Sequence, residues 1–134
     1  MIVLEKINKT ELRKYVRLSY EGDIIGLKMY HVEPMNLRRA VKATVDMIEV
    51  AERSYQFKYY RIVNNGQPIG YVVTCGMILY SFCIQIKSRT REVLLSWWDS
   101  INKLMGAKFF VLLYQNNTRA IRFLIKRGDR KSVV

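Results

Sequence analysis

The side chains that most often carry chemistry are scarce in this sequence. There is one histidine, His31, and there are two cysteines, Cys75 and Cys83. One histidine cannot form a cluster, and the cysteines lack the close Cys/His spacing of a zinc site, so no metal centre is expected. Both cysteines fall in an apolar, strand-like region and are interpreted as buried thiols of a reducing compartment. His31 lies beside a predicted turn, where a surface role is a simpler interpretation than a catalytic one.

Basic side chains are abundant instead. The sequence has 23 Lys and Arg residues against 11 Asp and Glu, which gives a net charge of +12. Such a charge favours a nucleic acid, a nucleotide phosphate or an acidic protein surface as partner, and its sign alone does not choose among them. Homo- and hetero-oligomers also stay open. The candidate contacts to a nucleic acid or acidic partner are concentrated near the end of the chain, at Arg119, Arg122, Lys126 and Arg127.

The length of 134 residues fits a single domain over residues 1–134. Half of the residues are hydrophobic and a quarter are charged, which is a globular composition. No apolar run reaches the roughly 18 residues that span a bilayer, and Met1 to Lys9 lacks the apolar core of a signal peptide. We therefore expect a soluble, cytoplasmic protein with no membrane association.

The first half of the chain predicts one strand and two helices. Ile2 to Ile7 is a short apolar run typical of a strand, and Thr10 can cap a helix that continues to about Glu21. The segment from Asp23 to His31 is ambiguous between a loop and a short helix. After Pro34 an amphipathic helix is predicted by apolar side chains at helical spacing, namely Leu37, Ala40, Val41, Thr44, Val45, Ile48 and Ala51.

The middle of the chain predicts an antiparallel unit of three strands. Tyr59 to Val63 and Ile69 to Cys75 are rich in β-forming residues, and the Asn-Gly pair between them is typical of a hairpin turn. Met77 to Ile86 follows as a third, largely buried strand with a central position in the sheet.

A crossover then completes the predicted fold. A helix from Thr90 to Met105, with Trp97 and Ile101 in the core, leads to a buried strand from Phe109 to Tyr114. A last helix follows from about Thr118 to Arg127, with Asn117 as its cap. Because a helical crossover makes neighbouring strands parallel, the prediction is an α/β fold with a mixed sheet. Antiparallel strands are followed by a parallel β-α-β crossover and a C-terminal helix.

The last helix carries a resemblance to a known family. Its sequence from Asn117 to Gly128, N-T-R-A-I-R-F-L-I-K-R-G, is similar to the segment N-x-x-A-[IL]-x-F-Y-x-K-x-G-F of the GNAT family of N-acetyltransferases. In that family the segment forms the helix beside the CoA. An ordinary capped helix would also have Asn and Gly at its ends, but would not explain the register with the preceding strand and hairpin. The resemblance covers residues 59–128, and the first half by topology alone. It implies a GNAT-like fold, acetyl-CoA as the cofactor, and Asn117 at the cofactor site.

The loop that binds the CoA pyrophosphate in this family departs from its pattern here. The family has [QR]-x-x-G-x-[GA] after the fourth strand, and this chain has R-T-R-E-V-L at residues 89–94. The resemblance makes Arg89, Thr90 and Arg91 the candidate cofactor contacts. Glu92 and Leu94 replace the two small residues that let a phosphate approach the backbone at a helix N-terminus, so weakened phosphate binding is expected.

The catalytic groups of the family are also depleted. Its general acid, a tyrosine on the last helix, falls at Leu124. Tyr114, at the end of the predicted fifth strand, is the remaining catalytic candidate, although a tyrosine there is more often a packing residue. No carboxylate lies between Met77 and Ile86 to act as a base. The residues from Arg130 to Val134 predict at most one short strand in place of the two strands that close the family's sheet.

Three functions are compatible with these features. We favour a non-catalytic binding or structural protein that keeps the GNAT-like scaffold with a degenerate acyl-CoA site. The alternative is an active N-acetyltransferase that transfers acetyl from acetyl-CoA to an amine. Small, degenerate GNAT-like chains resemble accessory proteins of tailed phages, some of them carried in the virion, which would place the protein within a virion. A dedicated nucleic-acid binder is less favoured, because the tyrosines and tryptophans fit core positions better than a stacking platform.

Overall fold

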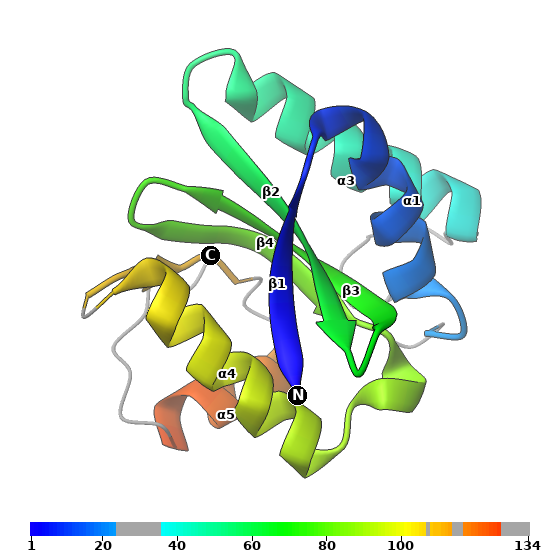
Figure 1. Cartoon of the computed structure of the whole chain (residues 1–134). Coiled ribbons are helices and arrows are strands. Elements are labelled where there is room, and N and C mark those ends of the chain that lie inside the picture. Colours follow the sequence, from blue (N-terminus) through cyan, green and yellow to red (C-terminus); the bar gives the residue numbers. More distant parts are fainter. Residues whose placement is uncertain (24–35, 107, 114–116, 127–134) are drawn as a thin grey trace.

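A five-stranded mixed sheet with helices on both faces forms the protein. The computed structural model describes residues 1–23, 36–106, 108–113 and 117–126. The strands lie side by side in the order β1-β2-β3-β4-β5, and Figure 1 shows α1 and α3 on one face of the sheet and α4 and α5 on the other. The elements are β1 (Ile2–Ile7), α1 (Lys9–Tyr20), α3 (Leu37–Glu52), β2 (Phe57–Asn64), β3 (Gln67–Cys75), β4 (Ile78–Ile84), α4 (Arg91–Met105), β5 (Phe110–Val111) and α5 (Thr118–Lys126). The predicted mixed α/β architecture is confirmed.

Strands β1 to β4 pair antiparallel in chain order. The β2–β3 hairpin turns at Asn65 and Gly66, whose φ angles of 49° and 81° are both positive. These are the angles of a type I′ turn, which matches the right-handed twist of the strands it joins and favours Asn-Gly for that reason. The hairpin predicted from this pair is confirmed.

Strand β5 pairs parallel with β4, as the crossover through α4 predicts. The paired part of β5 is Phe110–Val111, which is shorter than the predicted run from Phe109 to Tyr114. Phe109 and Leu113 are nevertheless buried on either side of it. The prediction from this apolar run was therefore right about burial, but it made the hydrogen-bonded part of the strand too long. Tyr114 lies outside the described residues.

The first helix starts earlier than predicted. Asn8, and not Thr10, is its N-cap: Asn8 Oδ1 accepts a hydrogen bond from the Glu11 N–H, and Glu11 Oε1 accepts one from the Asn8 N–H, both at 3.2 Å. This reciprocal capping box satisfies two backbone donors, whereas Thr10 lies within the helix and donates its hydroxyl to Asn8 Oδ1. The box explains why the prediction at Thr10 was wrong.

Each face of the sheet has its own core. On the α4/α5 face, Trp97, Trp98 and Ile101 of α4 pack with Leu124 of α5 and inward side chains of the sheet. On the α1/α3 face, most of the predicted stripe of α3 packs with α1 and with Tyr59, Tyr71 and Cys83, whereas Ala51 is half-buried outside this core. Trp97 and Ile101 are thereby confirmed as core residues. No helix in the described part of the chain is long and apolar enough to cross a membrane.

Candidate cofactor site

Strands β4 and β5 are paired over a short length only. Their register joins Ile78 to Phe110 and Leu79 to Val111, and the Leu112 N–H donates to the Leu79 carbonyl at 3.0 Å. On its other edge β4 has a bulge: Val73 of β3 lies opposite Ser81 and Thr74 opposite Leu79, which leaves Tyr80 as the extra residue. Bulges end regular pairing and are common next to functional sites. The remaining part of β4, up to Ile84, leads directly to the loop before α4.

That loop ends in the N-terminus of α4, where the helix dipole favours an anion. Thr90 is the N-cap and its Oγ1 accepts a hydrogen bond from the Val93 N–H at 3.2 Å. Glu92 is exposed in the first helical turn, and Arg91 is exposed beside it. The N-terminus thus already has one of its donors bonded and one carboxylate close to it.

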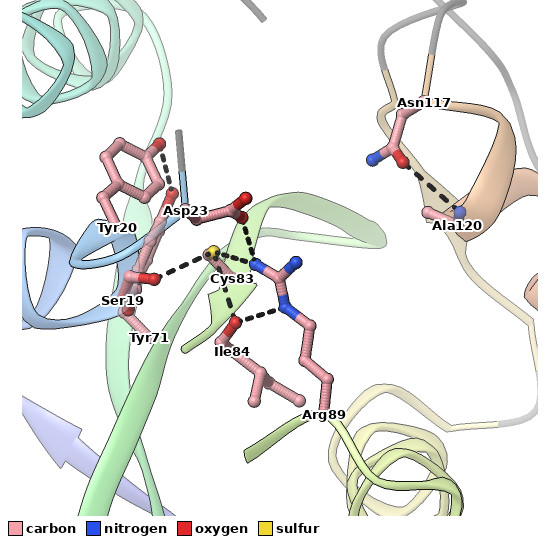
Figure 2. A network of polar contacts seen from close by, with 9 residues as sticks. All are labelled: Ser19, Tyr20, Asp23, Tyr71, Cys83, Ile84, Arg89, Asn117 and Ala120. Atoms are coloured by element: carbon pink, nitrogen blue, oxygen red, sulfur yellow. Dashed lines mark hydrogen bonds and ion pairs between the residues drawn. The ribbon is translucent and has the colours of Figure 1, made fainter. Parts of the chain in front are cut away.

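Arg89 does not extend into solvent from this loop. Its Nη2 donates to Asp23 Oδ2 at 2.7 Å, and its Nε donates to the carbonyl oxygen of Ile84, also at 2.7 Å. Figure 2 shows the guanidinium between these two acceptors, with Cys83 Sγ 3.5 Å from Nη2. The Asp23 side chain is 6% exposed and that of Arg89 is 30% exposed. The ion pair ties the start of the α4 loop to the end of α1.

The two cysteines differ. Cys83 is buried, and burial raises the pKa of its thiol to about 11 although the Arg89 guanidinium works against this shift. Since the thiolate is the reactive form, Cys83 is an inert packing residue that donates weakly to the Ser19 carbonyl at 3.6 Å. Cys75 is only half-buried, so the prediction of two buried thiols is wrong for Cys75. It is the last residue of β3.

Asn117 caps α5 as predicted: its Oδ1 accepts a hydrogen bond from the Ala120 N–H at 3.3 Å. Figure 2 draws Asn117 away from Arg89, with no contact between them. Arg89, Thr90 and Arg91 therefore gather at the start of α4, and Asn117 belongs to a separate helix start.

The basic candidates of α5 lie on one exposed side of that helix. Arg119, Arg122 and Lys126 are all exposed, whereas Arg127 lies outside the described residues. Leu124, at the position of the family's acid, is 3% exposed and belongs to the core between α5 and the sheet.

A chain of hydroxyl groups on the α1/α3 face was not predicted. Tyr20 Oη lies 2.7 Å from Thr44 Oγ1 and 3.3 Å from Tyr71 Oη, which lies 2.8 Å from Ser81 Oγ beside the β4 bulge. Burial raises the pKa of Tyr71 well above its ordinary value, so its hydroxyl stays protonated. These linked hydroxyl groups can fix one another's positions, but none of them accepts a proton near neutral pH. Among the described residues no three His, Cys, Asp or Glu side chains gather as metal ligands.

Several solved structures with this fold are named as acetyltransferases. An acetyltransferase from Thermus thermophilus superposes with a TM-score of 0.72 at 13% identity, covering 97% of this chain and 87% of that one. A GCN5-related N-acetyltransferase from Rhodopseudomonas palustris gives 0.62 at 18% identity, with 93% and 79% covered. The PaiA N-acetyltransferase from Thermoplasma acidophilum, in complex with coenzyme A, gives 0.55 at 13% identity, with 95% and 88% covered. No protein-family model and no curated protein matches the sequence. The fold is that of the GNAT acetyltransferases, as the resemblance implied.

Proposed function

We propose that this protein is a non-catalytic binding or structural protein on the GNAT scaffold, with a degenerate acyl-CoA site. The observation that carries the proposal is the engagement of Arg89. Its guanidinium, the leading cation of the loop that would receive a pyrophosphate, is already neutralised by the Asp23 carboxylate at 2.7 Å. A bidentate phosphate contact through the Nε and Nη2 edge of this guanidinium would require its bonds to Ile84 and Asp23 to break, and breaking the second would leave a carboxylate that is 6% exposed without its ion pair.

The start of α4 supports the same proposal. A phosphate at a helix N-terminus is held by free N–H groups and by the positive end of the helix dipole. Here Thr90 Oγ1 takes up the Val93 N–H, and the Glu92 carboxylate opposes a second anion in the first turn. Both features weaken the binding of a pyrophosphate at the N-terminus of α4.

The site also lacks the acid and base groups that acetyl transfer would need. Leu124 offers no hydroxyl to protonate a departing thiolate, and it is packed in the core. Strand β4 carries no carboxylate, and the hydroxyl chain ending at Ser81 contains no base. Because general acid and base groups each contribute about 10²- to 10⁴-fold, a chain without them would be a poor acetyltransferase. The finer form of this proposal, an accessory protein of a phage virion, rests on the family resemblance alone.

Calorimetric titration with acetyl-CoA tests the proposal, together with an acetyl-transfer assay on polyamines and lysine peptides. We expect weak binding and no turnover. The variant Glu92→Gln should tighten acetyl-CoA binding about two- to fivefold, because a charge in the first helical turn is worth about 0.3–1 kcal/mol. Glu49→Gln, which makes the same charge change at an exposed position on α3, is the matched control and should leave binding unchanged. Tight binding and turnover by the unmodified protein would overturn the proposal.

The alternative, an active N-acetyltransferase, is favoured by one observation. The ladder between β4 and β5 is two residue pairs long and ends next to the β4 bulge, in a fold shared with a coenzyme A complex, and an acyl group would fit where that pairing ends. If the unmodified protein turns over acetyl-CoA, Tyr114→Phe identifies the acid: loss of activity assigns the proton transfer to Tyr114, and retained activity assigns it elsewhere.

A further inference from the structure

The outer side of α1 carries a basic groove that the acyl-CoA site does not use. This shallow, open groove has a volume of about 550 Å³ and is lined by Thr10, Arg13, Lys14, Arg17, Leu18 and Glu21. These residues follow the i, i+3, i+4, i+7 rows of one helix side, opposite the buried side formed by Leu12, Tyr15, Val16 and Ser19. The groove belongs to α1, whereas the cofactor loop lies at the start of α4 (Figure 1).

Four basic residues of the described chain are already engaged in ion pairs. Lys9 pairs with Glu52, Lys42 with Asp46, Arg61 with Glu5 and Arg89 with Asp23. Arg13, Lys14 and Arg17 are exposed, and within the part of the chain that the structure describes no carboxylate lies within 4.0 Å of their charged groups.

These cations also carry a small energetic cost. Arg13 and Arg17 are four residues apart on the helix, where like charges destabilise by a few tenths of a kcal/mol. Glu21, one turn beyond Arg17, does not form an ion pair with it. The Lys14 ammonium lies 5.4 Å from the centroid of the Tyr15 ring, and Arg17 lies in the last turn of α1, where a cation favours the helix dipole. An external anion would engage the donors that these contacts leave exposed.

The composition of the groove indicates which anion. Leu18 is its one apolar lining residue, and it is half-buried, so the groove lacks the aromatic and aliphatic anchors that dominate stable protein interfaces. The aromatic residues of α1, Tyr15 and Tyr20, are buried in the core and offer no surface on which unpaired bases could stack. Arg13 and Arg17 lie about 6 Å apart along the helix axis, at 1.5 Å per residue, a spacing that suits successive phosphates of a nucleic-acid backbone, and Lys14 lies next to Arg13.

We propose that α1 binds the phosphate backbone of duplex nucleic acid, without sequence preference, through Arg13, Lys14 and Arg17. Three phosphate contacts predict a slope of about −2.7 in the logarithm of affinity against the logarithm of salt concentration, at about −0.9 per contact. Affinity from these contacts should therefore fall about 40-fold between about 50 and 200 mM salt. This binding is independent of acetyl-CoA and of the proposed loss of catalysis.

Fluorescence anisotropy with labelled duplex DNA of two unrelated sequences tests the site in the full chain. The triple variant Arg13→Gln, Lys14→Gln, Arg17→Gln should weaken binding by at least tenfold at low salt and make the salt slope shallower by about 2.7. The matched control is Arg119→Gln, Arg122→Gln, Lys126→Gln on α5, which removes the same three charges from another exposed helix side. Both variants change exposed residues, so thermal melting should show the same fold for each.

Five outcomes overturn the proposal. Equal losses in the two triple variants would show that only net charge matters, and a larger loss in the α5 variant would assign the contact to α5. Tighter binding of single-stranded DNA than of duplex, or equal binding of polyglutamate at matched charge, would point to a different partner. Addition of acetyl-CoA should leave DNA binding unchanged, and competition between the two would place the nucleic acid at the cofactor site instead.

Discussion

The two faces of the sheet are packed by different means. The α1/α3 face buries hydroxyl groups in a continuous chain from Thr44 through Tyr20 and Tyr71 to Ser81. The α4/α5 face buries aromatic rings, with the Trp97 ring centroid 5.1 Å from that of Phe82 and 6.0 Å from that of Trp98. On that face the Trp97 Nε1–H is buried without a hydrogen-bond partner. One face thus fixes its geometry by directional bonds, and the other is stabilised by apolar area at the cost of an unpaired donor.

The largest expected effect comes from the aromatic face. Trp97→Ala should lower the free energy of unfolding by about 3–5 kcal/mol, because the ring is 3% exposed and its removal leaves a cavity. Trp97→Phe is the matched control: it keeps much of the ring contact and removes the unpaired N–H, so its loss should be clearly smaller. Denaturant unfolding measures both. Equal losses for the two variants would contradict the view that packing area stabilises this face.

A smaller effect is expected from the hydroxyl face, with a distinctive dependence on pH. Tyr71→Phe should cost about 1–2 kcal/mol at neutral pH, since it leaves Tyr20 and Ser81 without a shared buried partner. Burial raises the pKa of Tyr71 in the folded state above its value of about 10 in the unfolded chain. The unfolded state therefore loses this proton first as the pH rises, and the Tyr71 contribution is full below about pH 10 and declines above it.

The difference between Tyr71→Phe and the unmodified protein should accordingly narrow in alkaline solution. Urea unfolding at neutral pH and above about pH 10 measures this change. A constant difference across that range would show that Tyr71 is not buried in its protonated form. Tyr20→Phe tests the other side of the same contact.

The smallest effect concerns the cysteines and leaves stability unchanged. Cys75 is half-buried at the end of β3, whereas Cys83 is buried with a thiol pKa raised to about 11 by burial. An aromatic disulfide reagent at neutral pH should modify Cys75 and leave Cys83 unmodified until the protein unfolds. The variants Cys75→Ser and Cys83→Ala assign the reactive thiol. Rapid modification of Cys83 in the folded protein would show that this face opens readily.

Local order could be predicted wherever neighbouring residues determine it. The Asn65-Gly66 turn, the cap at Asn117 and the buried stripe of α3 depend on residues within a few positions of one another. The one wrong cap, Thr10, failed because the Asn8–Glu11 box competes for the same helix start. The parallel placement of β5 also followed from the sequence, since a helical crossover permits little else.

Only the tertiary structure decided which distant polar groups meet. Arg89 and Asp23 are 66 positions apart in the sequence, and Tyr20 and Tyr71 are 51 apart. Nothing in the local pattern around Asp23, which follows the end of α1, indicates a guanidinium partner from the α4 loop. A short-range pattern reports which side chains are buried, because burial follows helix and strand periodicity. The partner that a buried charge finds depends on how the elements pack, and here that packing brings Arg89 of the loop before α4 to Asp23.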